Sequence, residues 1–231
     1  MSEAISFIPR ISNGRWFRAL PDGLRDALGE FAVVRRLPAG QCLFSRGDAP
    51  CGLYCVVEGA VRIGVVGANG KEALLGLIEP PNWFGEICLF DGQARTHDAF
   101  AERPTTLLQI PQAALLRLLD QHPEYWRELG LLMSHKLRML FGVLEAHSLL
   151  PAAPRLARRL LLIAEGYGGA SIGRRELNLP QEQLASMLSL SRQTTNQILK
   201  ELEARGILRL GYGTIEIVDH AGLCDAAQNP G

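Results

Sequence analysis

The sequence predicts an α+β protein with an N-terminal antiparallel β jelly roll, a long helix and a C-terminal winged helix-turn-helix. Three observations support this fold class. Short β-type runs alternate with glycine-containing turns between residues 31 and 110. Residues 123–150 carry apolar side chains at helical spacing, and two short amphipathic runs joined by a tight turn occupy residues 180–208.

Length and composition limit the number of domains and the class of protein. The chain has 231 residues, enough for two domains, and no formal net charge. Residues 152–231 hold nine Arg/Lys against eight Asp/Glu, or +1, so we expect only modest non-specific attraction to nucleic acid. The sequence shows neither a signal peptide nor an apolar run of about 18 residues, which predicts a cytoplasmic protein without a membrane partner. Its five scattered cysteines fit reduced thiols.

The N-terminal half is read as one helix followed by strands. Residues 13–30 have helical spacing that Pro21 interrupts. We expect strands in FAVVRR, QCLF, LYCVVE, AVRIGVV and KEALLGLIE, with a hairpin turn at Asn69-Gly70, and then near residues 96–103 and 105–110. Pro111 ends this region, and a short helix is expected over 112–120.

A long helix is predicted from near Pro123 to about Leu150. Its apolar stripe comprises Trp126, Leu129, Met133, Leu137, Leu140 and Leu144. A helix this long needs more apolar contact than one small domain offers, so we expect part of it to pair with a second copy in a homodimer. The alternative is that the stripe covers its own jelly roll. The expected domains are therefore 1–121, a dimerisation helix at 122–150, and 151–231.

The remaining C-terminal elements follow from breaks in the pattern. Pro151 to Pro154 should break the long helix and form a hinge, with a new helix over Arg155–Glu165. ILRL and TIEIV flank Gly211-Tyr212-Gly213, which indicates a small β-wing, and the tail from Ala221 is expected to be loose.

The paired helices at 180–208 carry the main functional prediction. Pro180 suits the first turn of the leading helix, Ser191 is a natural N-cap for the second, and Gly206 ends it. The second helix of such a unit enters the DNA major groove, so its N-terminal side chains should meet base edges. These are Arg192, Gln193, Asn196 and Gln197, while Ser191, Thr194 and Lys200 are placed to contact phosphates. The alternative is an ordinary helical hairpin with a solvated polar face.

The order of the parts resembles the CRP/FNR family of bacterial transcription regulators from about Trp16 to Val218. Two stretches carry the resemblance. SRQTTNQILKELEARGIL (191–208) resembles the family's recognition helix, and FGEICLFDGQARTHDA (84–99) resembles the phosphate-binding cassette of cyclic-nucleotide domains. The resemblance implies a DNA-binding regulator, not an enzyme, with an effector site in the jelly roll.

The resemblance also implies roles for the cassette residues. Gly85 allows a tight turn, Arg95 clamps a phosphate, Thr96 donates a hydroxyl, and Glu86 accepts from a ribose hydroxyl. The alternative is that Glu86 and Arg95 pair with each other and hold the loop without a ligand. Three alternatives for the effector therefore remain: a cyclic nucleotide, another phosphate-bearing ligand, or no effector.

Two departures weigh against cyclic AMP as that effector. His97, followed by Asp98, stands where the family usually has alanine after the phosphate-binding pair. Leu140 and Phe141 align with positions that present hydroxyls to adenine in the cyclic-AMP receptor. Neither offers a hydrogen bond to a purine edge, although Phe141 can stack on one.

Other sensing chemistries find few ligands in the sequence. Strand alternation puts Cys51 and Cys55 on one face, as inert core residues rather than part of an iron–sulfur site. His97, near Cys88, is the one weak candidate for heme and the only histidine in the β region, too few for a metal-binding jelly-roll enzyme. We expect no metal. The other open alternative is a signalling module that binds a small molecule without reading DNA.

The resemblance implies two recognition helices about 34 Å apart on a near-palindromic double-stranded DNA site. Gln193 and Gln197 stand where the cyclic-AMP receptor has a cytosine acceptor and a second guanine reader. We therefore expect a changed operator that keeps an Arg192–guanine contact. RNA polymerase is the further partner expected of an activator.

Overall fold

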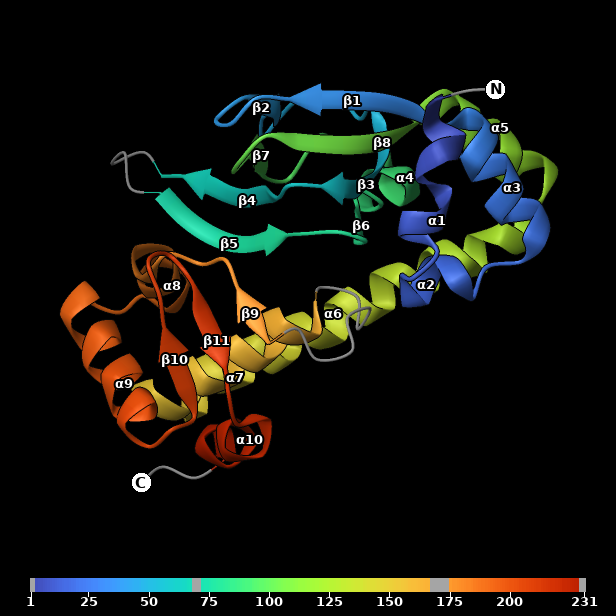
Figure 1. Ribbon diagram of the computed structural model, residues 1–231. Coiled ribbons are helices and arrows are strands. Elements are labelled where there is room, and N and C mark those ends of the chain that lie inside the picture. Colours follow the sequence, from blue (N-terminus) through green and yellow to red (C-terminus); the bar gives the residue numbers. More distant parts are fainter. Residues whose placement is uncertain (1–2, 68–71, 167–174, 229–231) are drawn as a thin grey trace. The chain divides into compact units, whose positions relative to one another are not determined.

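The computed structural model describes residues 3–67, 72–166 and 175–228. Contacts between residues divide the chain into two compact units, the first ending at Leu137 and the second beginning at Arg138. Figure 1 shows that this division falls inside one continuous helix. Within the described ranges, no helix combines the length and apolarity needed to cross a bilayer.

Four helical segments precede the first strand: η1 (Glu3–Phe7), α1 (Ile8–Ile11), α2 (Arg15–Arg18) and α3 (Asp22–Phe31). The predicted helix over 13–30 is confirmed as α2 and α3, and Pro21 is the residue that separates them and caps α3. The sequence did not predict η1 and α1. They are anchored by Ala4 and Ile11, both fully buried, and two positions are too few for a periodic signal.

The first unit is a sandwich of two four-stranded sheets, as predicted, and all its paired strands are antiparallel. One sheet has the order β1 (Val33–Leu37), β8 (Thr105–Pro111), β3 (Gly52–Glu58), β6 (Trp83–Phe84). The other has the order β2 (Cys42–Phe44), β7 (Asp98–Ala101), β4 (Val61–Val66), β5 (Glu72–Ile78). The predicted Asn69-Gly70 hairpin turn lies outside the described residues.

Strands β3 and β8 are buried on both faces. Their inner face, with Tyr54 and Leu107, packs between the sheets. Their outer face, with Leu53 and Leu108, packs against the N-terminal helices and α5 (Gln112–Gln121), which gather at one end of the sandwich in Figure 1. The predicted helix after Pro111 is therefore confirmed, and it closes the larger of the two cores of this unit.

The prediction that Cys51 and Cys55 share a face was wrong. Cys55 lies in the core beneath the helices, whereas Cys51 packs against the core between the sheets. The alternation stops before Cys51, because β3 begins at Gly52 and this glycine has a φ of 131°. A side chain there would meet the carbonyl oxygen of Ile110.

The predicted long helix is α6 (Trp126–Leu149), preceded by the 3-10 turn η2 (Pro123–Tyr125). Its first turns belong to the first unit, where Leu129 and Leu132 are buried and the Trp16 indole donates to the Glu128 carbonyl at 2.7 Å. Beyond these turns the large apolar side chains become exposed, namely Leu137, Leu140, Phe141, Leu144 and Leu149.

The second unit continues with α7 (Ala152–Glu165), β9 (Glu176–Leu177), α8 (Gln181–Leu188), α9 (Arg192–Ala204), β10 (Leu208–Leu210), β11 (Ile215–Ile217) and α10 (His220–Gln228). Helices α7 to α10 and the three strands share one apolar core. The predicted winged helix-turn-helix is confirmed, with β10 and β11 paired antiparallel around the predicted wing turn.

Two predictions in this unit need correction. Helix α7 begins at Ala152 rather than Arg155, because Pro154 fits in a first turn where its missing N–H costs no hydrogen bond. The tail from Ala221 is not loose but forms α10, which buries Leu223, Ala226 and Ala227. Two of these three residues are alanines, so the sequence shows only a weak apolar stripe.

Candidate functional site

The turn between α8 and α9 fixes the direction of α9. Ser189 ends α8 in the left-handed region with a φ of 54°. Two residues later Ser191 is the predicted N-cap, and its side-chain oxygen accepts from the Thr194 N–H at 3.0 Å. Thr195 is fully buried and its hydroxyl donates to the Ser191 carbonyl at 3.0 Å. The first turn of α9 is therefore held from both the solvent side and the core side.

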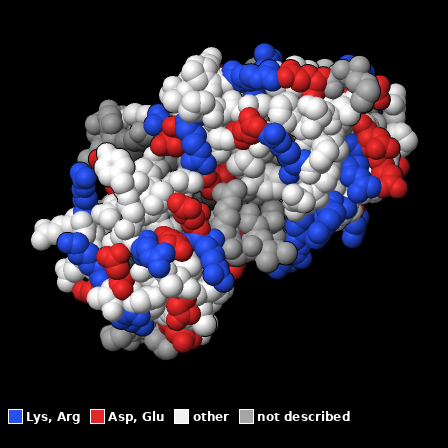
Figure 2. All heavy atoms as spheres, in the orientation of Figure 1, with Lys and Arg blue, Asp and Glu red and all other residues white. Residues whose placement is uncertain are grey.

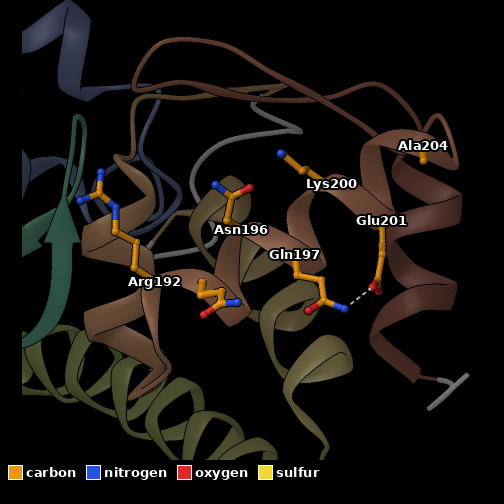
Figure 3. A pocket seen from close by; sticks show the side chains of 7 residues that line it. Arg192, Asn196, Gln197, Lys200, Glu201 and Ala204 are labelled. Atoms are coloured by element: carbon orange, nitrogen blue, oxygen red, sulfur yellow. Dashed lines mark hydrogen bonds between the residues drawn. The ribbon is translucent and has the colours of Figure 1, made fainter.

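The outward face of α9 forms a hollow of about 800 Å³, lined by Arg192, Gln193, Asn196, Gln197, Lys200, Glu201 and Ala204. Arg192, Asn196 and Lys200 follow one another at four-residue spacing and project to one side of the helix in Figure 3. All four predicted base-reading residues are thus brought together on one surface.

Most of these groups have no partner among the residues that the structure describes. Across the described residues, neither Arg192 nor Lys200 forms an ion pair, and the Asn196 Oδ1 atom is buried without a hydrogen-bond partner. Gln197 differs, because its amide donates to Glu201 Oε1 at 3.1 Å, as Figure 3 shows. Glu201 therefore adds a negative charge to this surface that the sequence analysis had not considered.

Charge elsewhere on the second unit is mixed. On the face seen in Figure 2, its acidic and basic side chains are interspersed. In the wing, Arg209 pairs with Glu216 at 2.6 Å, and Tyr212 stands fully exposed at the tip. On this face the unit therefore shows mixed charge rather than a strongly basic field.

In the first unit the predicted cassette lies beside a cavity of about 160 Å³. Gly85, Glu86, Arg95 and Thr96 all line it, and α4 (Ile87–Asp91) follows as the expected short helix. Gly85 has a φ of 96°, and a side chain there would crowd the Arg95 guanidinium, so the tight turn needs glycine. The other cavity-lining residues are Phe44, Ile63, Ile78, Phe84, Ile87, Cys88, His97 and Lys136.

Arg95 is bound by the protein itself. Its side chain is buried, and it donates to the carbonyl oxygens of Gly85 at 3.1 Å and Gly52 at 2.8 Å. The guanidinium carbon lies 4.4 Å from the centre of the Phe44 ring. Its Nε atom is buried with no hydrogen-bond partner, so one donor of this cation is unused.

Glu86 does not pair with Arg95, so that alternative was wrong. The Glu86 carboxylate is buried and accepts from Lys136 Nζ of α6 at 2.6 Å. Lys136 was missed by the sequence analysis, because fifty residues separate it from its partner. It gives the cavity a second cation and ties the cassette to the long helix.

The other predicted effector residues lie as follows. The Thr96 hydroxyl is 2.8 Å from His97 Nδ1, and burial together with the nearby Arg46 charge lowers the pKa of His97. Leu140 and Phe141 are 51% and 60% exposed on the part of α6 that belongs to the second unit. Within the described ranges, no three His, Cys, Asp or Glu residues are grouped so as to hold a metal ion.

Comparison with known proteins identifies both units. Residues 34–122 match the cyclic nucleotide-binding domain, and residues 154–226 match the Crp-like helix-turn-helix domain. The cyclic AMP receptor protein of Thermus thermophilus is 33% identical over 84% of this chain and 88% of its own length. The chain belongs to the CRP/FNR family of transcription regulators. Its predicted fold, its DNA-binding helix-turn-helix and its non-enzymatic class are thereby confirmed.

Further relatives agree with this assignment. A cAMP-activated global regulator of Mycobacterium tuberculosis is 28% identical over 83% of this chain and 86% of its own length. Among solved structures, a CRP/FNR-family regulator from Thermus thermophilus superposes with a TM-score of 0.66 at 26% identity, covering 86% of this chain and 100% of its own. FixK2 from Bradyrhizobium japonicum has a TM-score of 0.75 at 19% identity, over 87% of this chain and 99% of its own, which supports the fold.

Proposed function

We propose that this regulator binds DNA as a homodimer, with α9 reading base edges through Arg192, Gln193, Asn196 and Gln197. The exposed polar side of α9 carries this proposal, because Arg192 and Lys200 form no ion pair with any described residue and can exchange water for DNA. Ser191, Thr194 and Lys200 hold the adjoining phosphates. Gln197 has to leave Glu201 before it can pair with a base.

The dimer is supported by the exposed part of α6. Leu137, Leu140 and Leu144 are about half exposed and repeat at three- and four-residue spacing, which is the pattern of a helix that packs against a second helix. Two copies paired in this way, as a dimerisation helix over 122–150, would bind a near-palindromic site. Light scattering at micromolar concentration tests it, and a monomer would contradict the proposal.

For the first unit we propose a phosphate-bearing nucleotide effector, held by Arg95 and Thr96 with Glu86 facing a hydroxyl. The buried cation with an unused Nε donor supports it. A cavity of about 160 Å³ is small beside the roughly 300 Å³ or more of typical ligand pockets, so binding has to open it. The Thermus relative is named for cyclic AMP, and a Xanthomonas campestris regulator of known structure, 22% identical, is described as responsive to c-di-GMP.

One observation favours the alternative that the regulator works without a nucleotide effector. The two charged residues of the cassette that are proposed to bind the effector already have partners, since Arg95 binds two carbonyl groups and Glu86 binds Lys136. A cassette satisfied in this way also suits a regulator that works without a nucleotide. A module that does not read DNA finds no comparable support, because Arg192 and Lys200 form no ion pair with any described residue.

Selection from random DNA fragments tests these proposals together. The purified protein is incubated with fragments alone, with cyclic AMP, with cyclic GMP and with cyclic di-GMP, and the retained DNA is sequenced. A two-fold motif enriched only with a nucleotide supports the full proposal. Equal enrichment in all samples keeps the DNA proposal and contradicts the effector. No motif in any sample contradicts base reading by α9. RNA polymerase recruitment at the recovered site then separates an activator from a repressor.

A further inference from the structure

One thiol of the first unit lies in a polar environment that neither DNA reading nor packing requires. Cys51 Sγ is 3.1 Å from Arg95 Nη2 and 3.0 Å from the Tyr54 hydroxyl. Arg95 and Tyr54 are only 3% and 2% exposed, whereas Cys51 is partly exposed. Two buried polar side chains therefore converge on the sulfur of a partly exposed residue.

The direction of both hydrogen bonds follows from the chemistry of the donors. A guanidinium has only N–H groups to offer, so Arg95 donates to the sulfur. Burial raises the pKa of Tyr54 well above its usual range, and the neighbouring Cys51 raises it further. The phenol therefore keeps its proton and can donate it to the same sulfur. A sulfur that accepts from two donors, one of them cationic, lies in an electropositive environment of the kind found around reactive cysteines.

The position of Cys51 is fixed as well as its electrostatics. Its carbonyl oxygen accepts from the Gln109 amide at 2.9 Å, and the Gln109 Oε1 atom accepts from Arg35 at 2.8 Å. Gly52, the next residue, is held where its carbonyl binds Arg95 at 2.8 Å. The thiol thus sits in a rigid frame rather than on a mobile loop.

The other four cysteines lack this combination. Cys55 is fully buried, and its burial raises the pKa of the thiol. Cys88 is buried and lies 4.0 Å from Arg95 Nη1, on the far side of the same guanidinium. Cys42 is exposed but contacts only the Ser45 hydroxyl at 3.5 Å, and Cys224 is 3.6 Å from His220 Nδ1.

We propose that Cys51 is a peroxide-reactive thiol that forms a sulfenic acid. The Cys51 sulfur attacks one oxygen of hydrogen peroxide and an S–O bond forms as the O–O bond breaks. The released hydroxide takes up the thiol proton as water, so the sulfur is oxidised and the peroxide is reduced. Arg95 and Tyr54 are positioning residues that hold the sulfur in place through their hydrogen bonds.

Oxidation of Cys51 is expected to affect ligand binding at the neighbouring effector site. This consequence rests on the proposed role of Arg95 in that site. The new sulfenic oxygen is an additional acceptor beside Arg95 Nη2, which already binds Gly52. It holds the guanidinium more firmly in its present position, where it serves the protein rather than a phosphate. Peroxide is therefore expected to weaken nucleotide capture.

Competition among the five thiols of the intact protein tests the proposal. The reduced protein is treated with limiting hydrogen peroxide, sulfenic acid is trapped with dimedone, and labelled peptides are quantified by mass spectrometry. Accessibility alone favours Cys42, whereas the proposal expects Cys51 to be labelled about ten times faster than Cys42. Labelling of Cys42 or Cys224 at the rate of Cys51 or faster would overturn it.

Two variants test whether the hydrogen bond from Tyr54, and not only the exposure of Cys51, sets the labelling rate of this thiol. Tyr54→Phe keeps the ring and removes the donor, so labelling of Cys51 should fall about threefold, the effect of one hydrogen bond. Tyr125→Phe is the matched control: it makes the same change at a tyrosine that stacks on His122, and it should leave the rate unchanged. An unchanged rate in Tyr54→Phe, with its melting temperature retained, would contradict the positioning role.

The effector consequence has its own readout. Cyclic AMP is expected to raise the melting temperature of the reduced protein, to raise it less after peroxide, and to raise it equally in Cys51→Ser with or without peroxide. No cyclic AMP shift in the reduced protein contradicts the proposed nucleotide role, while the labelling ratio still decides the reactivity of Cys51.

Discussion

The two predicted sites differ in how their polar groups are satisfied. On α9, Arg192 and Lys200 face solvent and form no ion pair within the described chain. In the cassette, Arg95 and Glu86 are 3% and 2% exposed and are bound to backbone carbonyls and to Lys136. Both sites carry comparable charged and polar groups, but one presents them to solvent and the other holds them inside.

This difference indicates what each site needs in order to act. The proposed reading surface of α9 is already assembled, because its cap and its buried Thr195 fix the first turn without DNA. The proposed effector site would have to exchange internal partners for ligand contacts, and in the free protein its charged groups contribute to stability. Mutations should therefore affect folding at the cassette and affinity at α9.

The largest expected effect is on the buried ion pair of the cassette. Lys136→Ala leaves the Glu86 carboxylate buried without its partner and should lower the free energy of unfolding of the first unit by about 3 kcal/mol. Urea unfolding followed by tryptophan fluorescence measures it, since Trp16, Trp83 and Trp126 all lie in this unit.

The matched control removes both charges. The double variant Glu86→Gln/Lys136→Met leaves no unpaired buried charge and should recover most of the lost stability. If the double variant is as unstable as Lys136→Ala, the loss comes from packing rather than charge, and the contrast between the sites disappears.

Arg192→Ala should instead lower DNA affinity and leave the stability of the protein unchanged. Because its side chain is exposed and forms no ion pair, stability should not change, but affinity for the selected DNA site should fall by about 1–3 kcal/mol. Fluorescence anisotropy with labelled DNA gives the affinity. Arg205→Ala, at the exposed C-terminal end of α9, is the control and should bind with near-native affinity.

Ser191 is expected to contribute both to the stability of the second unit and to its affinity for DNA. Two substitutions are needed to separate these contributions. Ser191→Ala removes the cap and should lower the thermal stability of the second unit by about 1 kcal/mol. Ser191→Asp keeps a capping oxygen and that stability, yet its negative charge should repel DNA phosphate. Native affinity in Ser191→Asp would show that Ser191 lies away from the phosphates.

The smallest effect is a pH dependence confined to the first unit. Burial and neighbouring cations lower the pKa values of His97 and His135 from an ordinary value of 6.5. Above that value the two histidines are neutral in both states. As the pH falls below about 6.5, the unfolded state takes up protons first, so stability should decrease. Urea midpoints from about pH 7.5 to about pH 5.5 measure it, and His97→Gln/His135→Gln should flatten the curve.

The sequence predicted what depends on short-range patterns. The Ser191 cap, the polar row of α9 and the wing all follow from residues within one turn or one hairpin, and α6 from a repeated apolar stripe. These features need no knowledge of distant contacts, which explains why they could be placed from residue order alone.

The cassette partners could not be predicted in the same way. The contacts of Arg95 with Gly52 and of Glu86 with Lys136 join residues more than forty positions apart. Only the folded sandwich brings them together, and the sequence equally allowed Glu86 to pair with Arg95. Helix α10 was missed for another reason, because it buries small alanines that give no strong periodic signal.

A double-mutant cycle between Arg192 and guanine N7 tests base reading by α9 most directly. The selected DNA site is prepared with guanine or 7-deazaguanine at each conserved position, and affinities are measured for the native protein and Arg192→Ala. Loss of N7 at one guanine should weaken native binding by about 1–2 kcal/mol and scarcely change binding by Arg192→Ala. The same loss with both proteins at every guanine would show that Arg192 does not read the base.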